Sequence, residues 1–492
     1  MSQSNPITID NFQAGVGASP YVGFGKMVGL DIFNKPGIIQ SGPRLDNTGT
    51  TFSGLVTAQA ISTNGTLFQG TFDGKLYKNG ILLQSGLGSV HDLAIIQDYL
   101  IISKNGSTLD LYGPISSGSS YVSNWQTGLE NSVYGKKKMV VGKDNVVYIG
   151  NETKLASITG FSAGTGTLNT QILLTGIFND KSVQTICEYN RYIAIMTGSG
   201  GSSYGNSTLY FMDRGTVDVS QVTFSVGIGI DIPERNVTQM ITNNNKLYFF
   251  GGDTGTLYQT NQVTYTAVAM LPNRLALQTY STYCNAISLV NNQILIGVGG
   301  DHNDAFDVVY GIYAFRGNAL VCKSLISSGG YGQTNAISIG SIIAGGGVDT
   351  YFASWQDGSS VGVDQSSFRL GTNYNVYFES PFYETGTAIK PRTFQTVQFN
   401  FANNLVSSQS LRLKYRIASN ASWTTFATYS YSGNTLTMTF ADGSVSSQTG
   451  LFNTFHSKFP VTNTTNMQVR VEYNTGTATY GTNIELQSIT LI

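Results

Sequence analysis

The stretch AISTNGTLFQG at residues 60–70, followed by GKLY at residues 74–77, is the first copy of a phrase that recurs along the chain. It consists of an apolar run, a polar turn, a second apolar run, and a turn glycine followed by Leu-Tyr. The second runs of the successive copies are anchored at Leu67, Leu100, Val147, Ile193, Leu247, Ile294 and Tyr351. The spacings between these anchors are 33, 47, 46, 54, 47 and 57 residues. This regularity indicates a structural repeat.

A period of about 45 residues with two or three strand-like runs is typical of β-propeller blades. A single blade cannot bury both of its faces, whereas radial packing between two neighbours buries both, and closure of the ring leaves only short edges. The repeat therefore predicts a seven-bladed β-propeller over residues 51–370. A β-sandwich with irregular hairpins is the alternative reading.

The composition favours an all-β chain. Charged residues make up only 11% of the 492 residues, whereas the chain holds 57 glycines, 28 tyrosines and 26 phenylalanines. Tyr and Phe suit strands, and Gly suits turns. No apolar stripe with the 3.6-residue helical period is sustained beyond about three turns.

The pattern changes near residue 370 to strict alternation of apolar and polar residues. Alternating runs occupy residues 394–401, 411–417, 435–440, 467–473 and 484–489. Such runs predict strands with one buried and one solvated face. We predict a jelly-roll-like β-sandwich over residues 371–492, in which Arg412, Lys414 and Arg416 line one solvated face.

Residues 1–50 are predicted to form an N-terminal arm. Ile38–Gln40 is the candidate strand that closes the ring by joining the last blade, since unpaired blade edges would otherwise meet. The arm at residues 1–36 is too rich in glycine to fold alone, so we expect it to reach a neighbouring subunit or the tail above it. Its candidate contact residues are Phe12, Tyr21 and Phe24.

The charge and the cysteine content exclude several classes of protein. A net charge of −1 argues against sequence-independent binding of nucleic acid, and Lys136–Lys138 is expected to be a solvated loop. The three cysteines, Cys187, Cys284 and Cys322, lie in apolar runs and are expected to be buried free thiols. We find neither a secretory signal nor an apolar run long enough to span a membrane.

Two long hairpin insertions carry candidate binding residues. In the second insertion, Asp301, Asn303 and Asp307 could offer oxygen ligands to calcium, although a plain polar loop is the alternative and the spacing does not fit an EF-hand. The aromatic residues Tyr204 and Phe306 could act as platforms for sugar stacking, or they could pack against their own loops.

Catalytic motifs are weak. Gly-x-Ser-x-Gly occurs at residues 201–205 and 358–362, but neither site has the strand–turn–helix context of a nucleophile elbow. A propeller glycosidase needs two convergent carboxylates, and the sequence does not single out a pair. Residues 354–358 (SWQDG) are only a fragment of a sialidase box. We therefore predict no catalytic residues and no cofactor.

Two regions resemble virion proteins of tailed bacteriophages. The arm sequences NFQAGVGASPY (11–21) and GLDIFNKPG (29–37) are similar to the N-terminus of phage tail propeller proteins. The segment ESPFYETG (379–386), together with residues 390–394, 413–416 and 422–423, resembles the sandwich domain that follows such propellers. The resemblance implies a structural protein of the tail or nozzle and supplies no catalytic residues.

The combined expectation is a non-enzymatic structural subunit of a phage tail, made in the host cytoplasm and assembled in a symmetric ring. Its partners would be other copies of itself, other virion proteins and host surface glycan. One alternative is a receptor-binding or glycan-binding tail protein, and another is a propeller glycosidase or depolymerase.

Overall fold

The computed structural model describes residues 6–10, 26–35, 37–131, 136–175, 181–199, 206–214, 223–225, 229–235, 237–271, 280–300, 309–328, 336–347, 349–370, 376–384, 392–418, 421–476 and 483–492. Within these ranges the regular structure is strands and turns, without an α-helix. Accordingly, the described part of the chain has no helix long and apolar enough to cross a membrane.

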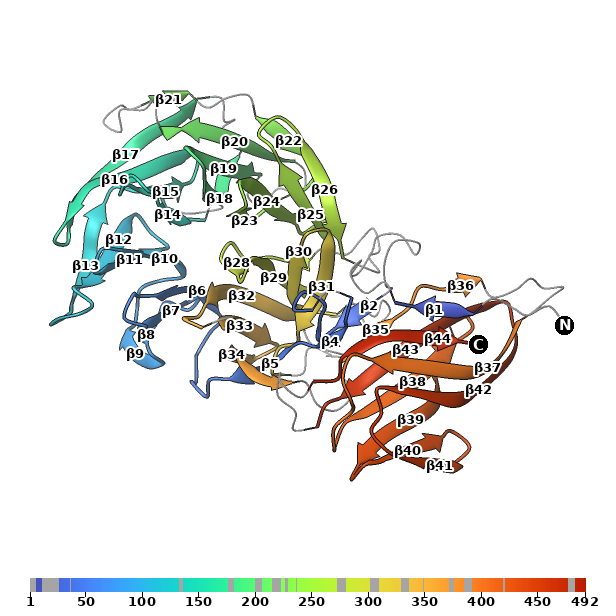
Figure 1. The fold of residues 1–492 in the computed structure, drawn as a ribbon. Coiled ribbons are helices and arrows are strands. Elements are labelled where there is room, and N and C mark those ends of the chain that lie inside the picture. Colours follow the sequence, from blue (N-terminus) through green and yellow to red (C-terminus); the bar gives the residue numbers. More distant parts are fainter. Residues whose placement is uncertain are drawn as a thin grey trace.

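Small sheets follow one another along most of the chain and curve around a centre (Figure 1). Sheet 1 contains β6 (Val56–Ile61), β7 (Leu67–Thr71), β8 (Leu76–Lys78) and β9 (Ile81–Gln84). Sheet 2 contains β10 (Val90–Ile96), β11 (Tyr99–Lys104), β12 (Thr108–Gly113) and β13 (Ser120–Thr127). Sheet 3 contains β14 (Met139–Val141), β15 (Val147–Asn151), β16 (Lys154–Ser162) and β17 (Thr165–Thr175), with β21 (Thr223–Ser225) added in parallel.

The next sheets repeat this antiparallel pattern. Sheet 4 contains β18 (Ser182–Tyr189), β19 (Tyr192–Gly198), β20 (Ser207–Asp213) and β22 (Ile230–Ile232). Sheet 5 contains β23 (Gln239–Asn243), β24 (Lys246–Gly251), β25 (Thr256–Thr260) and β26 (Tyr265–Met270). Sheet 6 contains β28 (Ile287–Val290), β29 (Gln293–Gly300), β30 (Gly311–Arg316) and β31 (Ala319–Ser324), and β27 (Tyr280–Ser281) pairs with β29. Sheet 7 contains β32 (Ile337–Ala344), β33 (Tyr351–Asp357), β34 (Ser360–Leu370) and β5 (Pro43–Asn47).

The repeated phrase of the sequence runs from the end of the first strand through the second to the third strand; in sheet 1 its runs lie on β6, β7 and β8. Each anchor from Leu67 to Tyr351 lies on a second strand, and all the anchors are buried apart from the half-buried Leu67. The turn before the anchor uses a left-handed residue, for example Gly65 (φ 83°), Asn145 (φ 61°) and Asn245 (φ 58°). Gly and Asn tolerate this conformation, so the turn residues and the apolar runs specify the same hairpin in each copy.

The first strands of the sheets form a closed series of contacts. β6, β10, β14, β18, β23, β28 and β32 touch in that order, and β32 touches β6. Each sheet buries its faces against its neighbours; between sheets 1 and 2, for example, Phe68 packs in one cluster with Leu93 and Leu100. Phe52 and Val363 belong to the cluster where sheet 7 meets sheet 1. The architecture is therefore all-β and propeller-like.

The strand that joins the last sheet is not the predicted one. β5 pairs antiparallel with β34, with Asn47 opposite Asp364 and Leu45 opposite Ser366. The predicted segment Ile38–Gln40 instead turns toward the C-terminal part, where Ile39 bridges Leu486. Leu45 is 2% exposed, so burial of its apolar side chain favours β5 as the closing strand.

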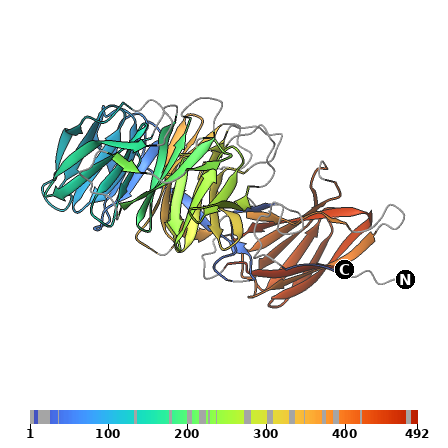
Figure 2. The ribbon, with the colours of Figure 1, turned by 90° about the horizontal axis from the view of Figure 1, so that it is seen from above.

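The C-terminal part consists of two antiparallel sheets and forms a second lobe (Figure 2). One sheet contains β1 (Ile7–Ile9), β44 (Leu486–Leu491), β37 (Arg392–Phe401) and β42 (Thr454–Thr464). The other contains β2 (Lys26–Val28), β35 (Val376–Glu379), β36 (Tyr383–Glu384), β43 (Asn466–Asn474), β38 (Ser410–Arg416), β39 (Thr424–Ser432), β40 (Thr435–Phe440) and β41 (Val445–Thr449). Aromatic contacts join the sheets, including Phe399 with Tyr429 at 5.1 Å and Phe426 with Phe459 at 4.9 Å between ring centroids. This part is sandwich-like.

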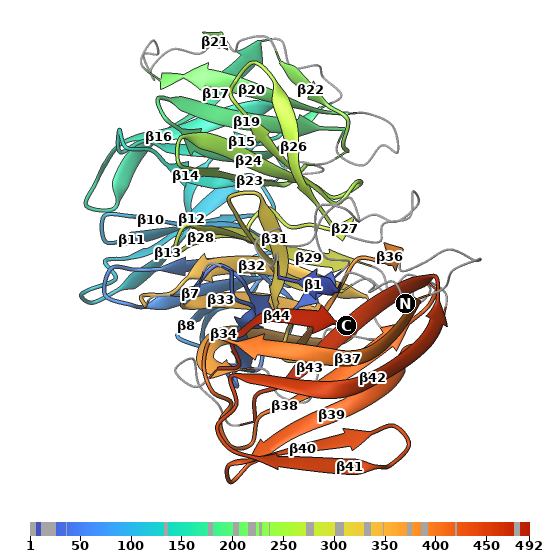
Figure 3. The same cartoon turned by 45° about the vertical axis from the view of Figure 1, so that its right-hand side comes forward.

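The described strands of the arm pair within their own chain. β1 lies beside β44 (Figure 3), and β2 pairs with β35 as well as with β31 of sheet 6. β3 (Leu30–Asp31) pairs with β4 (Gln40–Ser41). The expectation that the arm reaches a neighbouring subunit or the tail above it stays a prediction, although residues 7–9 and 26–31 already pair with edges of the same chain.

Candidate functional site

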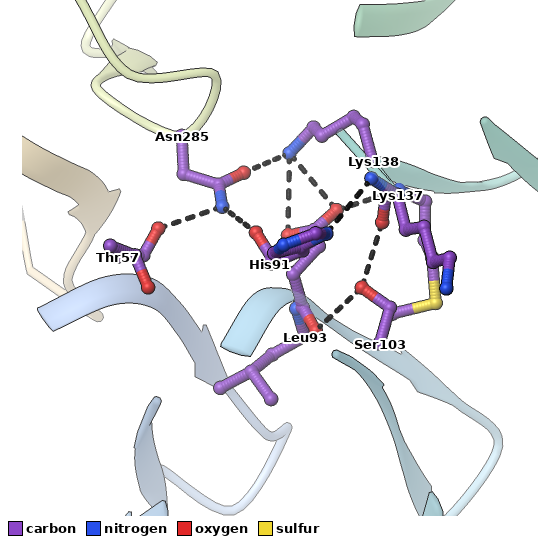
Figure 4. A network of polar contacts seen from close by, with 9 residues as sticks. Thr57, His91, Leu93, Ser103, Lys137, Lys138 and Asn285 are labelled. Carbon is purple, nitrogen blue, oxygen red and sulfur yellow. Dashed lines mark hydrogen bonds and ion pairs between the residues drawn. The ribbon is translucent and has the colours of Figure 1, made fainter. Parts of the chain in front are cut away.

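Polar side chains from non-adjacent sheets meet at the centre of the propeller-like part (Figure 4). The amide nitrogen Nδ2 of Asn285, at the start of sheet 6, donates to the carbonyl oxygens of Thr57 in sheet 1 and His91 in sheet 2, both at 2.9 Å. Its Oδ1 accepts a hydrogen bond from Nζ of Lys138, which leads into sheet 3. Sheets 1, 2, 3 and 6 can meet in this way only across the central axis. We call these residues, with Asp92, the axial network.

Irregularities in the first strands make the two carbonyl groups available. The register of β6 against β7 shifts between Val56 and Ala58, and that of β10 against β11 shifts between Val90 and Asp92. A bulge leaves the extra residue out of the ladder. The extra residues are Thr57 and His91, so their carbonyl oxygens can accept the amide of Asn285.

Lys138 and Asp92 form the charged core of the axial network. Lys138 Nζ lies 3.3 Å from Oδ2 of Asp92, whose carboxylate also accepts the N–H groups of Met139 at 2.7 Å and Leu93 at 2.9 Å. Burial raises the pKa of Asp92, although Lys138 and the two N–H groups favour its charged form. Burial lowers the pKa of Lys138, but the Asp92 carboxylate outweighs it, so the pKa ends above its ordinary value.

The neighbouring Lys137 is enclosed by backbone oxygens. Its side chain is fully buried, and its Nζ donates to the carbonyl groups of Lys104, at 3.3 Å, and Gly106. Burial lowers the pKa of Lys137 to about 8, and burial also lowers that of His91 to about 4, which keeps the imidazole neutral at pH 7. His91 Nδ1 accepts the backbone N–H of Lys137 at 3.3 Å.

The prediction that Lys136–Lys138 forms a solvated loop is therefore wrong. Lys137 is buried and the Lys138 side chain is only 22% exposed, because both lysines find oxygen acceptors near the axis. Arg412, Lys414 and Arg416, which are predicted to line one solvated face, are half-buried. They share one face, but Arg412 and Lys414 pair with Glu472, and Arg416 donates to Gln468 at 2.7 Å.

The polar groups of the axial network bind one another, so the network can hold sheets together. It contains one carboxylate, Asp92, which already has three donors, whereas glycoside hydrolysis requires two convergent carboxylates. Among the residues that the structure describes, no group of three or more His, Cys, Asp or Glu side chains could hold a metal ion. The arrangement can hold four sheets at a fixed distance from the axis.

The residues that the sequence singled out for binding lie outside the part of the chain that the structure describes. Phe12, Tyr21, Phe24, Tyr204 and Phe306 lie outside the described residues. The calcium candidates Asp301, Asn303 and Asp307 lie outside them as well. Those assignments stay predictions.

The cysteines are free, as predicted from their apolar surroundings. Cys284 and Cys322 are buried, and Cys187 is half-buried. Burial raises the pKa of Cys284 to about 11 and that of Cys322 to about 12. Both thiols are therefore protonated and weakly nucleophilic at neutral pH.

No protein-family model and no curated protein matches the chain. Among solved structures it is similar to the extracellular domains of two B. thetaiotaomicron proteins described as hybrid two component systems, BT4673 (12% identity, TM-score 0.44) and BT3049 (10% identity, TM-score 0.45). The alignments cover 83% and 87% of this chain but only 47% and 59% of those chains. The computationally designed Ika8 protein matches at 13% identity and TM-score 0.38, over 69% of this chain and 96% of that one. Similarities at this level say nothing about function.

Proposed function

We propose that the chain is a seven-bladed β-propeller over residues 51–370, preceded by an arm at 1–50 and followed by a jelly-roll-like sandwich at 371–492. Support comes from the order of sheets 1 to 7, each with its anchor on the second strand, and from the contact between β32 and β6. The pairing of β5 with β34 supports an arm that contributes the closing strand of the ring. The alternating strands after residue 376 support the sandwich.

On this architecture, we propose a non-enzymatic structural subunit of a phage tail that assembles with copies of itself and with other virion proteins. The observation that carries the proposal is the axial network. It fills the centre, where propeller enzymes place their reacting groups, with a lysine–carboxylate pair and an amide that bind one another. The reason to propose a phage tail is the resemblance of motifs within residues 11–37 and 379–423 to phage tail proteins. In such a tail we expect copies of the chain to form a closed homomeric ring.

The test begins with the full chain, purified and imaged by negative-stain electron microscopy, with its mass measured under native conditions. We expect a ring of about six copies, as closed cyclic symmetry allows. Antibody raised against the chain should label the tails of particles that contain it. A chain that stays monomeric and releases oligosaccharides from host polysaccharide would instead be a depolymerase.

A further inference from the structure

Three side chains of the axial network bring an amine, a carboxamide and a carboxylate into contact. Nζ of Lys138 donates a hydrogen bond to Oδ1 of Asn285, and it lies 3.3 Å from Oδ2 of Asp92. The ends of Lys138 and Asn285 point toward one another (Figure 4). A nitrogen that is hydrogen-bonded to a carbonyl oxygen is within about 4 Å of the carbonyl carbon, near the separation of about 3–3.5 Å from which bound groups react. The amine therefore lies next to the amide carbon Cγ of Asn285.

The buried carboxylate can take the proton that keeps the amine unreactive. Asn285 is 7% exposed and Asp92 is 3% exposed, so little water surrounds the three groups. In such surroundings a proton can pass from Nζ of Lys138 to Asp92, because two neutral groups cost less to bury than two ions. Burial lowers the pKa of Lys138, but Asp92 more than offsets this, so the neutral amine is the minor form. A minor form is sufficient for a reaction that each chain carries out once.

The amide nitrogen of Asn285 is held as a leaving group. Its Nδ2 donates to the carbonyl oxygens of Thr57 and His91, both at 2.9 Å. When Nδ2 takes up a proton and departs, it becomes positively charged, and hydrogen bonds to charged donors are stronger than those to neutral ones. The two fixed carbonyl dipoles therefore stabilise the departing group more than they stabilise the starting amide.

We propose that Lys138 and Asn285 form an isopeptide bond. Nζ of Lys138, after giving one proton to Asp92, attacks Cγ of Asn285 from above the amide plane, which the flexible end of the lysine side chain permits. Asp92 passes this proton to Nδ2 and then accepts the second proton that Nζ loses. The bond between Nζ and Cγ forms, the bond between Cγ and Nδ2 breaks, and ammonia leaves, taking the remaining proton as ammonium. The step needs no oxidant or reductant.

The bond would join two sheets across the axis. Lys138 leads into sheet 3 and Asn285 precedes sheet 6, and the two residues are 147 positions apart. A covalent link that closes a long loop restricts the unfolded chain and so favours the folded one. The ion pair of Lys138 with Asp92 describes the network before the reaction. The reaction takes place within one copy, so it does not depend on how copies assemble.

Another lysine of the described chain has a similar contact. Nζ of Lys323 donates to Oε1 of Gln293 at 2.8 Å and lies 3.6 Å from Oδ1 of Asp349. This carboxylate is farther from its lysine than Asp92 is from Lys138, and its side chain is 15% exposed against 5% for Asp92. The axial network is thus the stronger of the two, and the contact of Lys323 serves as a comparison within the same chain.

Mass spectrometry of the purified full chain tests the proposal. We expect the intact chain to be lighter than its sequence by one ammonia molecule. Because other reactions of asparagine also release ammonia, a protease digest has to contain a branched peptide in which the segment with Lys138 is joined to the segment with Asn285. On a denaturing gel the bonded chain should run ahead of the Lys138→Met variant, since a closed loop makes the unfolded chain more compact.

The variants separate the chemistry from the fold. Lys138→Arg keeps the positive charge beside Asp92 but lacks the amine, and Asp92→Asn keeps the size of the side chain but cannot take the proton, so both should retain the full mass of their sequences. Lys154→Met, which breaks the ion pair with Glu130, should lose ammonia as the wild type does. A wild-type chain with its full sequence mass, or a branched peptide that joins Lys323 to Gln293 instead, overturns the proposal. A bond that forms equally well in Asp92→Asn overturns the role of Asp92.

Discussion

Replacement of Lys138 by Met probes the axial network most directly. Met keeps the length and the apolar stem of lysine but removes the ammonium group that binds Asp92 and Asn285. The Asp92 carboxylate, whose side chain is 5% exposed, would be left buried without its cation. Breaking a buried ion pair from one side costs about 3–5 kcal/mol, which is a large fraction of the stability of a typical domain.

The effect should depend on pH with a definite sign. Burial raises the folded-state pKa of Asp92 above its unfolded value, and loss of Lys138 raises it further. Such a group contributes stability at low pH that is lost as pH rises through the folded pKa. Lys138→Met should therefore be most destabilised at neutral pH and approach the wild type as the pH falls.

Urea unfolding followed by the fluorescence of Trp125 and Trp355, with hydrogen exchange of β10 and β14 as a local probe, measures the effect. The control is Lys154→Met, which breaks the ion pair with Glu130, whose side chain is 37% exposed; surface pairs contribute at most about 1 kcal/mol. If Lys138→Met costs no more than this control at pH 7, the axial network does not hold the sheets together.

Three further predictions concern other features. Leu45→Ala should destabilise the propeller part by about 2–5 kcal/mol by opening a cavity at the closing strand, whereas Leu82→Ala, at a residue 51% exposed, should have little effect in the same melt. Asn245→Ala should cost about 1–2 kcal/mol because Asn245 has φ 58°, and Asn245→Gly should be tolerated; equal melting temperatures would refute a role for the turn. Cys284 and Cys322 should react with a thiol reagent only after unfolding, since burial raises their pKa to about 11 and about 12, and rapid labelling of the folded chain would contradict the burial.

The repeat could be predicted from the sequence because the hairpins of the successive sheets require the same kinds of residue at the same places. Every hairpin needs a left-handed turn residue and a buried second strand, so Asn145, Asn245 and the apolar runs after them stand out without any knowledge of tertiary contacts. The alternation after residue 376 was readable for the same reason, since β38 and β40 each bury one face.

The axial network could not be read in this way. Asn285 and Thr57 are 228 positions apart and meet only because the ring closes. A run of three lysines normally indicates a solvated loop, and burial of Lys138 is favourable only because Oδ1 of Asn285 and the carboxylate of Asp92 meet its ammonium group. The signal that the sequence did contain was a polar residue near the start of some first strands, such as Asp92 in β10 and Gln239 in β23.

The pairing of early strands with late ones has a consequence for synthesis. β5 finds its partner only after β34 has been made, and β1 finds its partner only when β44 is complete. Contacts of such long sequence separation form slowly, because the entropy of closing the loop is lost before the contact can stabilise the chain. Until the ribosome has finished, the nascent chain therefore carries open sheet edges that can pair with the wrong neighbour. A chain terminated before β34 and β44 would leave β5 and β1 without their partner strands, and we expect it to assemble poorly with complete chains.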